Sequence, residues 1–215
     1  MVNTAEEFAA YLYEMARKDG QAPGFLTRME SLKGLKPSQV SLLILPPLKG
    51  VPEAELKEVR RLHKGGVNLL CSEDAASLKD LFDVENAAVV LERNGKKILT
   101  LKKNGKAQAA FFTIAPSMQQ RAKDRTGGSG QKALDAEINK ASMEILRLLG
   151  DYPVTATNKA AVTPFLGSDG HTYTFVQENS WPDHGGRIQT DVLFNGKVIC
   201  SVDLDLHESK LIRLD

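Results

Sequence analysis

Residues 40–85 read VSLLILPPLKGVPEAELKEVRRLHKGGVNLLCSEDAASLKDLFDVE and decide the fold class of this chain. The apolar run 40–45 predicts a short buried strand that ends at two prolines. Residues 53–64 predict a charged amphipathic helix, which a Gly-Gly pair ends. Residues 67–71 predict the next strand, and a second helix follows it. This order of strand, helix, strand and helix predicts parallel strands covered by helices.

Helices and hairpins are expected on either side of this stretch. A capping-box pattern, Thr4 with Glu7, begins a helix that stops before Gly20, and a second short helical stretch spans 25–32. After Val84 three β-rich runs are separated by Asn-Gly pairs, which favour hairpin turns because both residues tolerate positive φ. An antiparallel three-strand meander is therefore expected over residues 87–92, 97–101 and 108–114.

The second half of the chain has a different pattern. An α/β domain is expected over 1–115, then a flexible linker or loop over 116–131, which contains TGGSG, and a connecting helix over 132–150. Residues 151–215 predict a small antiparallel β-sandwich, because apolar and polar residues alternate with period two. Its strands are expected at 161–166, 171–178, 187–194 and 197–206. The buried positions expected in the last of these strands are Val198, Cys200, Val202, Leu204 and Leu206.

The composition is that of an ordinary soluble globular protein, with 42% hydrophobic and 26% charged residues and a net charge of +1. No apolar run approaches the roughly 20 residues that cross a bilayer. Cys71 and Cys200 fall in different expected domains without metal-ligand spacing, so free thiols are favoured over a disulfide framework. Between Arg93 and Arg125 there are nine basic residues and one acid. Interleaved aromatic residues are lacking there, so exposed hairpins are expected rather than a nucleic-acid-binding face.

Four segments carry a resemblance to a known family. They are LILP at 43–46, PEAEL at 52–56, HKGGVNLL at 63–70 and LFDVE at 81–85. Together they resemble the class I glutamine amidotransferase-like fold, in the non-catalytic version found in β-galactosidase trimerisation domains and in uncharacterised bacterial glycosidase-like proteins. The resemblance implies a flavodoxin-like three-layer domain with a parallel sheet, followed by a small β-sandwich. The tail, 162–214, is similar to that second domain.

The start of the chain departs from this family pattern. Such a domain usually opens with a strand, whereas only three residues precede the first expected helix here. Either the sequence is truncated and lacks the first strand, or the domain is a reduced variant; truncation or a fragment of a larger protein is favoured.

Cys71 and Glu73 are the candidate catalytic residues. Cys71 ends a predicted strand just before a predicted helix, where active members of the family place their nucleophile, and a helix N-terminus there would stabilise a thiolate. Against this, Glu73 and Asp74 oppose thiolate formation, and Leu69 and Glu73 stand where the active family's elbow needs glycine. The family's histidine follows the cysteine within the same domain, whereas the later histidines of this chain fall in the β-sandwich. A buried structural cysteine is therefore expected.

Trp181 and His184 are the candidate ligand-binding residues. Trp181 is the only tryptophan, and in its polar loop an exposed indole could stack on a sugar ring; the alternative is that it covers an edge of the sandwich. His184 stands alone, so no metal site is expected, and no motif implies a cofactor. Asp203 and Asp205 share one face of the last strand and are expected to be solvated rather than to form a glycosidase carboxylate pair.

The function expected from these patterns is that of a non-catalytic accessory region of a larger bacterial protein that acts on carbohydrates. Its partners would be the catalytic domain of that protein or a sister subunit, with carbohydrate as a further candidate ligand; no nucleic acid and no membrane span are expected. Two alternatives stay open: a cysteine-dependent amidotransferase-like or hydrolase activity at Cys71, and a carbohydrate-binding module that uses Trp181. The ligand, the oligomeric state and the cellular compartment are undetermined at this level.

Overall fold

The structure of this 215-residue chain is a computed structural model. It describes residues 4–18, 29–45, 51–72, 76–114, 116, 129–158, 160–178 and 186–215. The chain forms two compact units. Unit 1 consists of Met1–Leu12 with Leu26–Asp151, and unit 2 consists of Tyr13–Phe25 with Tyr152–Asp215.

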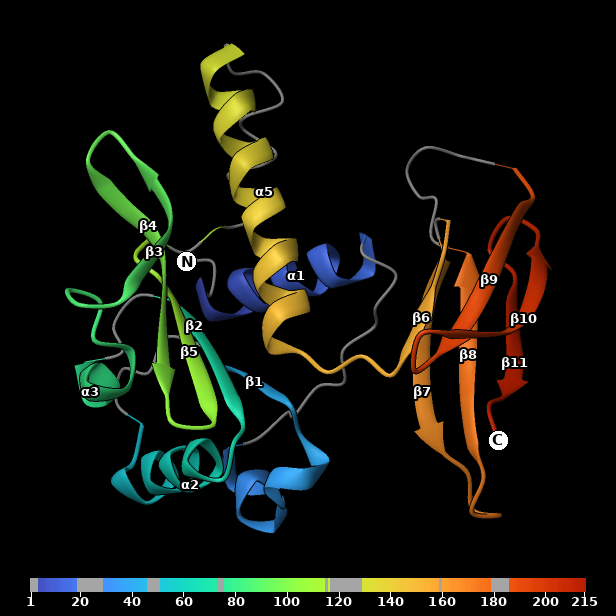
Figure 1. Cartoon of the computed structure of the whole chain (residues 1–215), viewed down its shortest axis with the longest axis horizontal. Coiled ribbons are helices and arrows are strands. Elements are labelled where there is room, and N and C mark those ends of the chain that lie inside the picture. The colour runs from blue at the N-terminus through green and yellow to red at the C-terminus, as the bar shows by residue number, and fades with distance from the viewer. Residues whose placement is uncertain are drawn as a thin grey trace. The chain divides into compact units, whose positions relative to one another are not determined.

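Unit 1 is built on one mixed five-stranded sheet (Figure 1). The parallel strands predicted for the first half are confirmed, because β1 pairs with β2 in parallel. The meander is confirmed as well, since β4 pairs antiparallel with both β3 and β5. A parallel pairing of β5 with β2 joins the two parts, and the local sequence pattern does not predict it. The strands in spatial order are β1 (Leu42–Leu45), β2 (Asn68–Ser72), β5 (Ala107–Phe112), β4 (Lys96–Asn104) and β3 (Ala88–Arg93).

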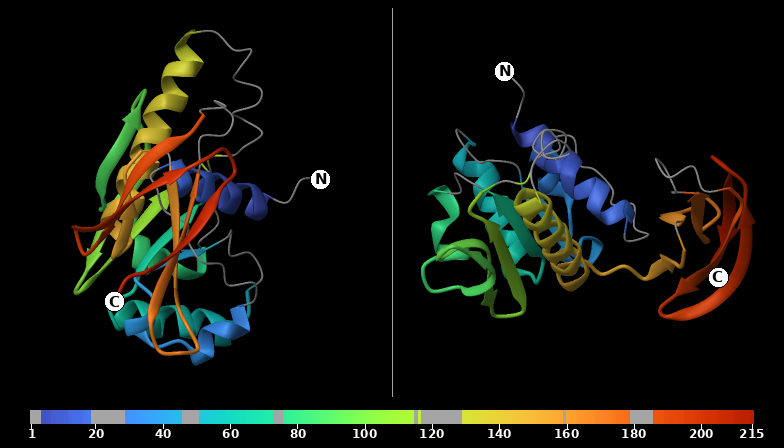
Figure 2. Two further views of the ribbon diagram at one scale, coloured as in Figure 1. Left: turned by 90° about the vertical axis from the view of Figure 1, so that its right-hand side faces the viewer. Right: turned by 90° about the horizontal axis from the view of Figure 1, so that it is seen from above.

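Helices lie on both faces of this sheet (Figures 1 and 2). They are α1 (Thr4–Lys18), α2 (Glu53–Lys64), α3 (Lys79–Phe82) and α5 (Ser129–Leu149), with the 3-10 helices η1 (Met29–Gly34), η2 (Pro37–Gln39) and η3 (Ala76–Leu78). Helix α5 begins at Ser129, before the expected start at Lys132. The second helix, expected after the strand 67–71, is divided into η3 and α3, because Leu78 has the non-helical dihedrals φ −128° and ψ 20°.

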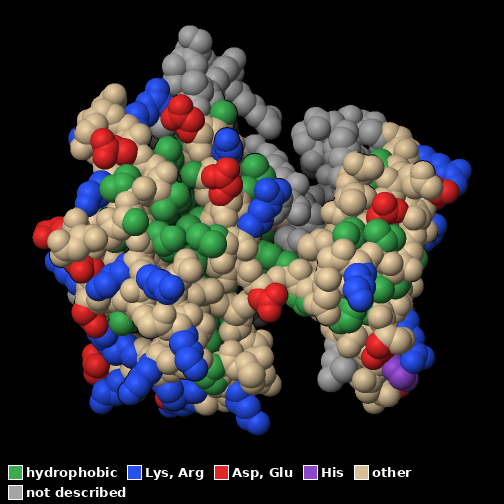
Figure 3. Space-filling model, viewed as in Figure 1, with side chains coloured by type: hydrophobic (Ala, Val, Ile, Leu, Met, Phe, Trp, Pro, Cys, Tyr) green, Lys and Arg blue, Asp and Glu red, His purple; other side chains and the backbone are tan. Residues whose placement is uncertain are grey.

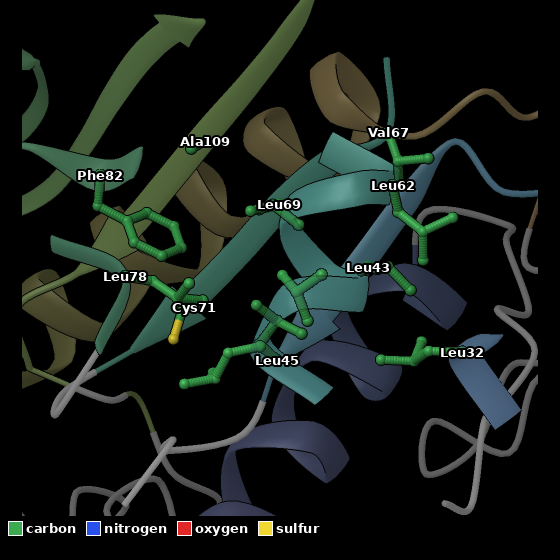
Figure 4. Packing of buried hydrophobic residues seen from close by; sticks show 12 residues of the cluster. Leu32, Leu43, Leu45, Leu62, Val67, Leu69, Cys71, Leu78, Phe82 and Ala109 are labelled. Atoms are coloured by element: carbon green, nitrogen blue, oxygen red, sulfur yellow. The ribbon is translucent and has the colours of Figure 1, made fainter. Parts of the chain in front are cut away.

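The main hydrophobic cluster of unit 1 lies between the sheet and α2 (Figure 4). Helix α2 contributes Leu56, Val59 and Leu62, whose spacing of three residues keeps them on one face. All three are at most 3% exposed. Full burial of one such side chain contributes about 1.5–3 kcal/mol to stability, so this helix face is a main source of the cohesion of unit 1. The strands contribute Leu43, Leu45, Leu69, Cys71 and Ala109.

Helices α1 and α5 cover the opposite face. The rings of Phe8 in α1 and Phe112 in β5 meet edge to face, with centroids 6.0 Å apart and an interplanar angle of 74°. The buried Tyr11 hydroxyl donates to Oδ1 of Asn139 at 2.8 Å and lies 3.1 Å from Oγ of Ser142. These polar contacts hold α1 against α5 and satisfy a hydroxyl that would otherwise be buried without a partner.

Unit 2 is built from two three-stranded antiparallel sheets. One has the order β10-β9-β6 and the other the order β11-β8-β7. Both sheets contribute side chains to one shared hydrophobic cluster, which includes Val192, Val176 and Leu204. The antiparallel, β-rich character expected for the end of the chain is therefore confirmed. The strands are β6 (Val154–Ala156), β7 (Ala160–Leu166), β8 (Thr172–Glu178), β9 (Ile188–Phe194), β10 (Lys197–Leu204) and β11 (Ser209–Arg213).

Two details of unit 2 differ from the sequence prediction. The chain from Lys197 onward makes two strands, since β10 stops at Leu204 and β11 begins at Ser209. The strict alternation expected for this segment is wrong at its ends, because Val198 is 57% exposed and Leu206 is 44% exposed. A register shift between Val198 and Cys200 turns the first residue out of the alternation, and Leu206 lies beyond the end of the strand.

Candidate functional site

The carboxyl ends of the parallel strands are the first place to look for a site in a sheet of this kind. Strands β1 and β2 end at Leu45 and Ser72. The segments that follow them, 46–50 and 73–75, lie outside the described residues, and so the candidate Glu73 lies outside them too. The third parallel strand, β5, ends at Phe112, and the Thr113 hydroxyl that follows it donates to the carbonyl of Lys97. The reactive side chains described at the ends of β1 and β2 are Cys71 and Ser72.

Cys71 is completely buried. Its Sγ donates to the carbonyl of Ser72 at 3.2 Å, and the side chain belongs to the same cluster as Leu45, Leu78 and Phe82. Burial raises the pKa of the Cys71 thiol to about 12, and a hydrogen bond with the backbone of Ser72 opposes that shift only in part. The next helices described after Cys71 are the 3-10 helix η3, which begins at Ala76, and α3, which begins at Lys79. The group is a protonated thiol at neutral pH and a poor nucleophile.

His63 does not serve as a base for this cysteine. The side chain is 4% exposed, and both ring nitrogens are engaged, Nδ1 with the carbonyl of Val67 and Nε2 with the amide of Asn104, each at 2.9 Å. Val67 lies just before the start of β2, whereas Cys71 lies near its end. Four residues of extended chain separate those two positions by about 13 Å, which is far beyond hydrogen-bond reach.

Ser72 places one unpartnered hydroxyl at this edge. The residue is completely buried, and its Oγ has no hydrogen-bond partner. Ser72 lies opposite Phe112, while Cys71 lies opposite Phe111, so the hydroxyl and the thiol point to opposite faces of the sheet. The described part of this edge thus brings together no nucleophile with a base.

Metal-binding groups are also missing from the described ranges. Among those residues no cluster of three or more histidine, cysteine or acidic side chains could hold a metal ion. In unit 2, Asp203 accepts a hydrogen bond from Arg187 at 2.7 Å, and Asp205 is exposed. The Asp203 carboxylate is thus paired with a guanidinium rather than with Asp205.

Trp181 and His184 lie outside the described residues. The structure instead brings together a set of aromatic residues that the sequence analysis does not single out, namely Phe165, Tyr173 and Phe175, here called the aromatic face. Phe165 in β7 lies directly opposite Tyr173 in β8. The spacing of Tyr173 and Phe175, two residues apart in one strand, was the available signal that they share a face. Which face is buried depends on the strands packed around β8.

A second exposed apolar region belongs to unit 1. Figure 3 shows hydrophobic side chains gathered between β3 and α5 on the visible face. Both elements carry exposed large hydrophobic residues, Val89 (43%) and Val90 (39%) in β3 and Leu148 (55%) in α5. Strand β3 is also an edge strand of the five-stranded sheet. Exposed apolar side chains beside an open strand edge are typical of a surface that packs against another protein.

Similarity to known proteins is found in the fold of this chain. No protein-family model matches the sequence, and no curated protein matches it. Among solved structures, the chain is similar to Gan42B, a GH42 β-galactosidase, with a TM-score of 0.51 and 14% sequence identity. That match covers 96% of this chain and 35% of the β-galactosidase chain, so this chain spans about a third of that protein's length. An apo GH42 exo-carrageenase from Bacteroides ovatus matches with a TM-score of 0.41 and 12% identity, over 97% of this chain and 26% of that one. The first likeness shows a fold shared with part of a glycosidase.

No helix within the described residues combines the length and the apolar character needed to cross a membrane.

Proposed function

We propose that this chain is a non-catalytic accessory region of a carbohydrate-active protein. The observation that carries the proposal is the fold likeness itself, which extends over 96% of this chain but only 35% of a GH42 β-galactosidase. An accessory region of a larger glycosidase would have this relation to the whole enzyme. The buried, protonated Cys71 supports the same view, because this candidate nucleophile is closed to substrate.

A finer assignment of the fold belongs to the same proposal. The parallel strands β1, β2 and β5 with helices on both faces are compatible with a reduced flavodoxin-like domain of the class I glutamine amidotransferase-like type. In this proposal residues 1–115 form the core of that domain, residues 132–150 connect, and residues 151–215 form the following β-sandwich.

The region between β3 and α5 is the surface that we assign to the partner, either the catalytic domain or a sister subunit. Val90 and Leu148 would be covered in the assembly, and the free edge of β3 would be shielded with them. An accessory region needs such a surface, because it acts by packing rather than by chemistry.

The test begins with turnover. The purified chain is assayed with p-nitrophenyl galactosides and with glutamine, and no turnover above the uncatalysed rate is expected. Enzyme-like turnover that disappears in Cys71→Ala would overturn the accessory role and favour a cysteine-dependent hydrolase or amidotransferase.

The sister-subunit form of the proposal is tested by sedimentation velocity over a range of concentrations. Self-association that is lost in Val90→Lys and in Leu148→Lys, but kept in Val198→Lys on β10, supports it. A chain that stays monomeric at all concentrations excludes a sister subunit and leaves a separate catalytic domain as the partner.

A further inference from the structure

The aromatic face lies on the outer side of the β11-β8-β7 sheet. In strand register, Phe165, Tyr173 and Arg213 form one row across the three strands, and Thr163, Phe175 and Leu211 form the next. Residues directly opposite one another in a sheet share a face, so all six side chains project to the same side. Val162 and Val176 of the same strands belong to the buried cluster of unit 2, which identifies the aromatic side as the outer one.

The rings of this face are nearly parallel and offset. The Phe165 ring contacts both of the others, with centroids 5.9 Å from Tyr173 at an interplanar angle of 22° and 5.3 Å from Phe175 at 25°. Separations of this size belong to offset rather than fully overlapping rings. Phe165 remains 38% exposed and Phe175 47% exposed. The offset therefore leaves ring surface available to a ligand.

Polar groups border one end of the aromatic face. The Tyr173 hydroxyl donates to Asp169 at 2.5 Å, and Nε of Arg213 lies 3.5 Å from the carboxylate of Asp215. The Nδ1 atom of His171 lies 3.4 Å from that same carboxylate. The hydrogen bond from Tyr173 holds the pKa of Asp169 below its usual range, so both acids are ionised at neutral pH. Donors and acceptors thus lie beside the rings.

The geometry points to a binding site for a neutral oligosaccharide on the aromatic face, with sugar rings stacked on Phe165 and Phe175 and hydroxyl groups bonded to the polar border. A pyranose ring has apolar C–H faces and a polar rim, and this surface has the same division. The inference deepens the proposed function, since it names the substrate class that a carbohydrate-active accessory region would hold.

The charge of the border selects a neutral ligand over an anionic one. Asp169 and Asp215 supply two carboxylates, whereas Arg213 is the one guanidinium beside them. A sulfated or uronic-acid oligosaccharide would meet net negative charge there, which disfavours binding. A neutral polyol makes hydrogen bonds to the carboxylates and to the guanidinium without electrostatic repulsion.

The area of the face argues against a second copy of the chain as the occupant. Aromatic side chains bury 150–250 Å² when fully covered. From the exposed fractions of Phe165, Phe175 and Leu211, the apolar area on offer is on the order of 300 Å². A stable interface needs roughly 800 Å² on each partner. The face is large enough for a few sugar rings and too small by itself for a stable dimer.

The experiment uses the full chain and defined probes. Binding of β-1,4-galactotetraose and cellotetraose is measured by calorimetry and by shifts of the phenylalanine ring signals in NMR spectra, with a sulfated neocarratetraose as the anionic probe. Phe175→Ala and Phe165→Ala are each expected to weaken binding of a neutral probe by about tenfold, the scale of one lost ring contact. Tyr173→Phe keeps the ring and removes the hydroxyl, so it reports on the polar border. Val198→Ala, an equally exposed apolar position on β10, is the matched control and is expected to bind as the wild type does.

Each outcome decides the inference. Neutral probes that bind, shift the ring signals and lose affinity only in the aromatic variants support it, with unchanged thermal unfolding as the check on folding. No binding of either neutral probe at millimolar concentration overturns it, as does binding that the phenylalanine variants leave unchanged. Preferred binding of the sulfated probe, or self-association that Phe175→Ala abolishes, overturns it in favour of an anionic ligand or of a protein interface. None of these results depends on turnover, so failure here is distinguishable from failure of the proposed function.

Discussion

The side chains of His63 and Asn104 are hydrogen-bonded to each other, with 2.9 Å between Nε2 and Nδ2, although 41 positions separate them in the sequence. An amide nitrogen only donates, so Nε2 is the acceptor, and Nδ1 carries the hydrogen that goes to the carbonyl of Val67. Nδ2 of Asn104 also donates to the carbonyl of Leu81 at 2.7 Å. One half-buried amide thereby ties the end of β4 to the end of α2 and to α3.

Removing that amide is expected to destabilise unit 1. Asn104→Ala leaves Nε2 of His63 and the carbonyl of Leu81 without their donor, and each unpaired buried group costs about 1–3 kcal/mol. We expect the free energy of unfolding in urea to fall by about 2–4 kcal/mol. Asn86→Ala is the matched control, because that amide makes one exposed bond to Asp83, and it is expected to change stability by less than about 0.5 kcal/mol. Equal losses in the two variants would show that the His63 network contributes nothing.

Because the pKa of the Cys71 thiol is raised, the protein is expected to lose stability at alkaline pH. Its pKa is about 12 in the folded chain against an ordinary value of 9.0. Below pH 9 both states keep the proton, so the contribution of the thiol is fully present and does not vary. Between pH 9 and about 12 the unfolded state loses the proton first, and the free energy of unfolding falls by up to about 1.4 kcal/mol per pH unit.

This prediction is checked by urea unfolding of the wild type and of Cys71→Ala at pH 8, 9.5 and 10.5. Lysine and tyrosine residues titrate in both proteins, so the difference between the two slopes isolates the thiol. The free energy of unfolding of the wild type should fall relative to that of Cys71→Ala as the pH rises. Iodoacetamide should label Cys71 only on unfolding. Parallel slopes, or rapid labelling of Cys71 in the folded protein, would contradict the buried thiol.

The ion pair of Arg60 and Asp80 is expected to make a small contribution to stability that is lost at acid pH. Nη1 and Nη2 of Arg60 bond the two oxygens of Asp80 at 2.5 and 3.0 Å, and this hydrogen bonding lowers the pKa of Asp80 from 3.8. The stabilisation is therefore present above pH 4 and lost as the pH falls through the lowered value. Both side chains are well exposed, so Arg60→Ala should cost less than about 1 kcal/mol at pH 6.

The check compares unfolding of wild type and Arg60→Ala at pH 6 and pH 3, where the difference should shrink. Lys140→Ala is the matched control, since its partner Glu144 lies 3.9 Å away and Lys140 is more exposed than Arg60. A pH-independent difference for Arg60→Ala would mean that the side chain acts through packing.

The side chain of Asn68 connects β2 with β5 and with α5, so its removal is expected to loosen these elements locally. Its Nδ2 donates to the carbonyl of Leu149 at 2.7 Å, and its Oδ1 accepts from the backbone N–H of Gln108 at 2.8 Å. Asn68→Ala should lower the free energy of unfolding by about 1–3 kcal/mol and speed hydrogen exchange at the Gln108 amide. Asn68→Asp keeps the acceptor for Gln108 and loses the donor to Leu149, so exchange at Gln108 should stay slow in that variant. Fast exchange in both variants would contradict the assigned roles.

The parts of the fold that were predictable are those set by neighbours along the chain. At Asn94 and Gly95 both φ angles are positive, 51° and 72°, as the Asn-Gly pair predicts for a hairpin turn. The strand before α2 and the strand after it are parallel because a helix between two strands returns the chain to the same end of the sheet. Helix and turn signals act over a few residues, so the sequence expresses them directly.

The candidate site was less predictable because its properties depend on packing. Cys71 was placed correctly at the end of a strand, but its raised pKa comes from groups such as Leu45 and Phe82 that surround it in space. The sequence did not predict the aromatic face. The alternation in 172–178 indicates that Tyr173 and Phe175 share a side of the strand, but it does not indicate which side is buried. The candidates Glu73, Trp181 and His184 remain predictions, as they lie outside the described residues.

By itself, the sequence determined the order of strand, helix and strand over residues 42–72, the parallel and hairpin pairings between neighbouring segments of the first half, and the β-rich character of the end of the chain. Only the tertiary structure decided that β5 pairs with β2, that the amide of Asn104 closes on His63, and that three rings emerge together on the outer side of one sheet. The reason is physical: turns and periodicity are local properties of the backbone, whereas burial, hydrogen-bond partners and exposed faces arise only when distant segments exclude water from one another.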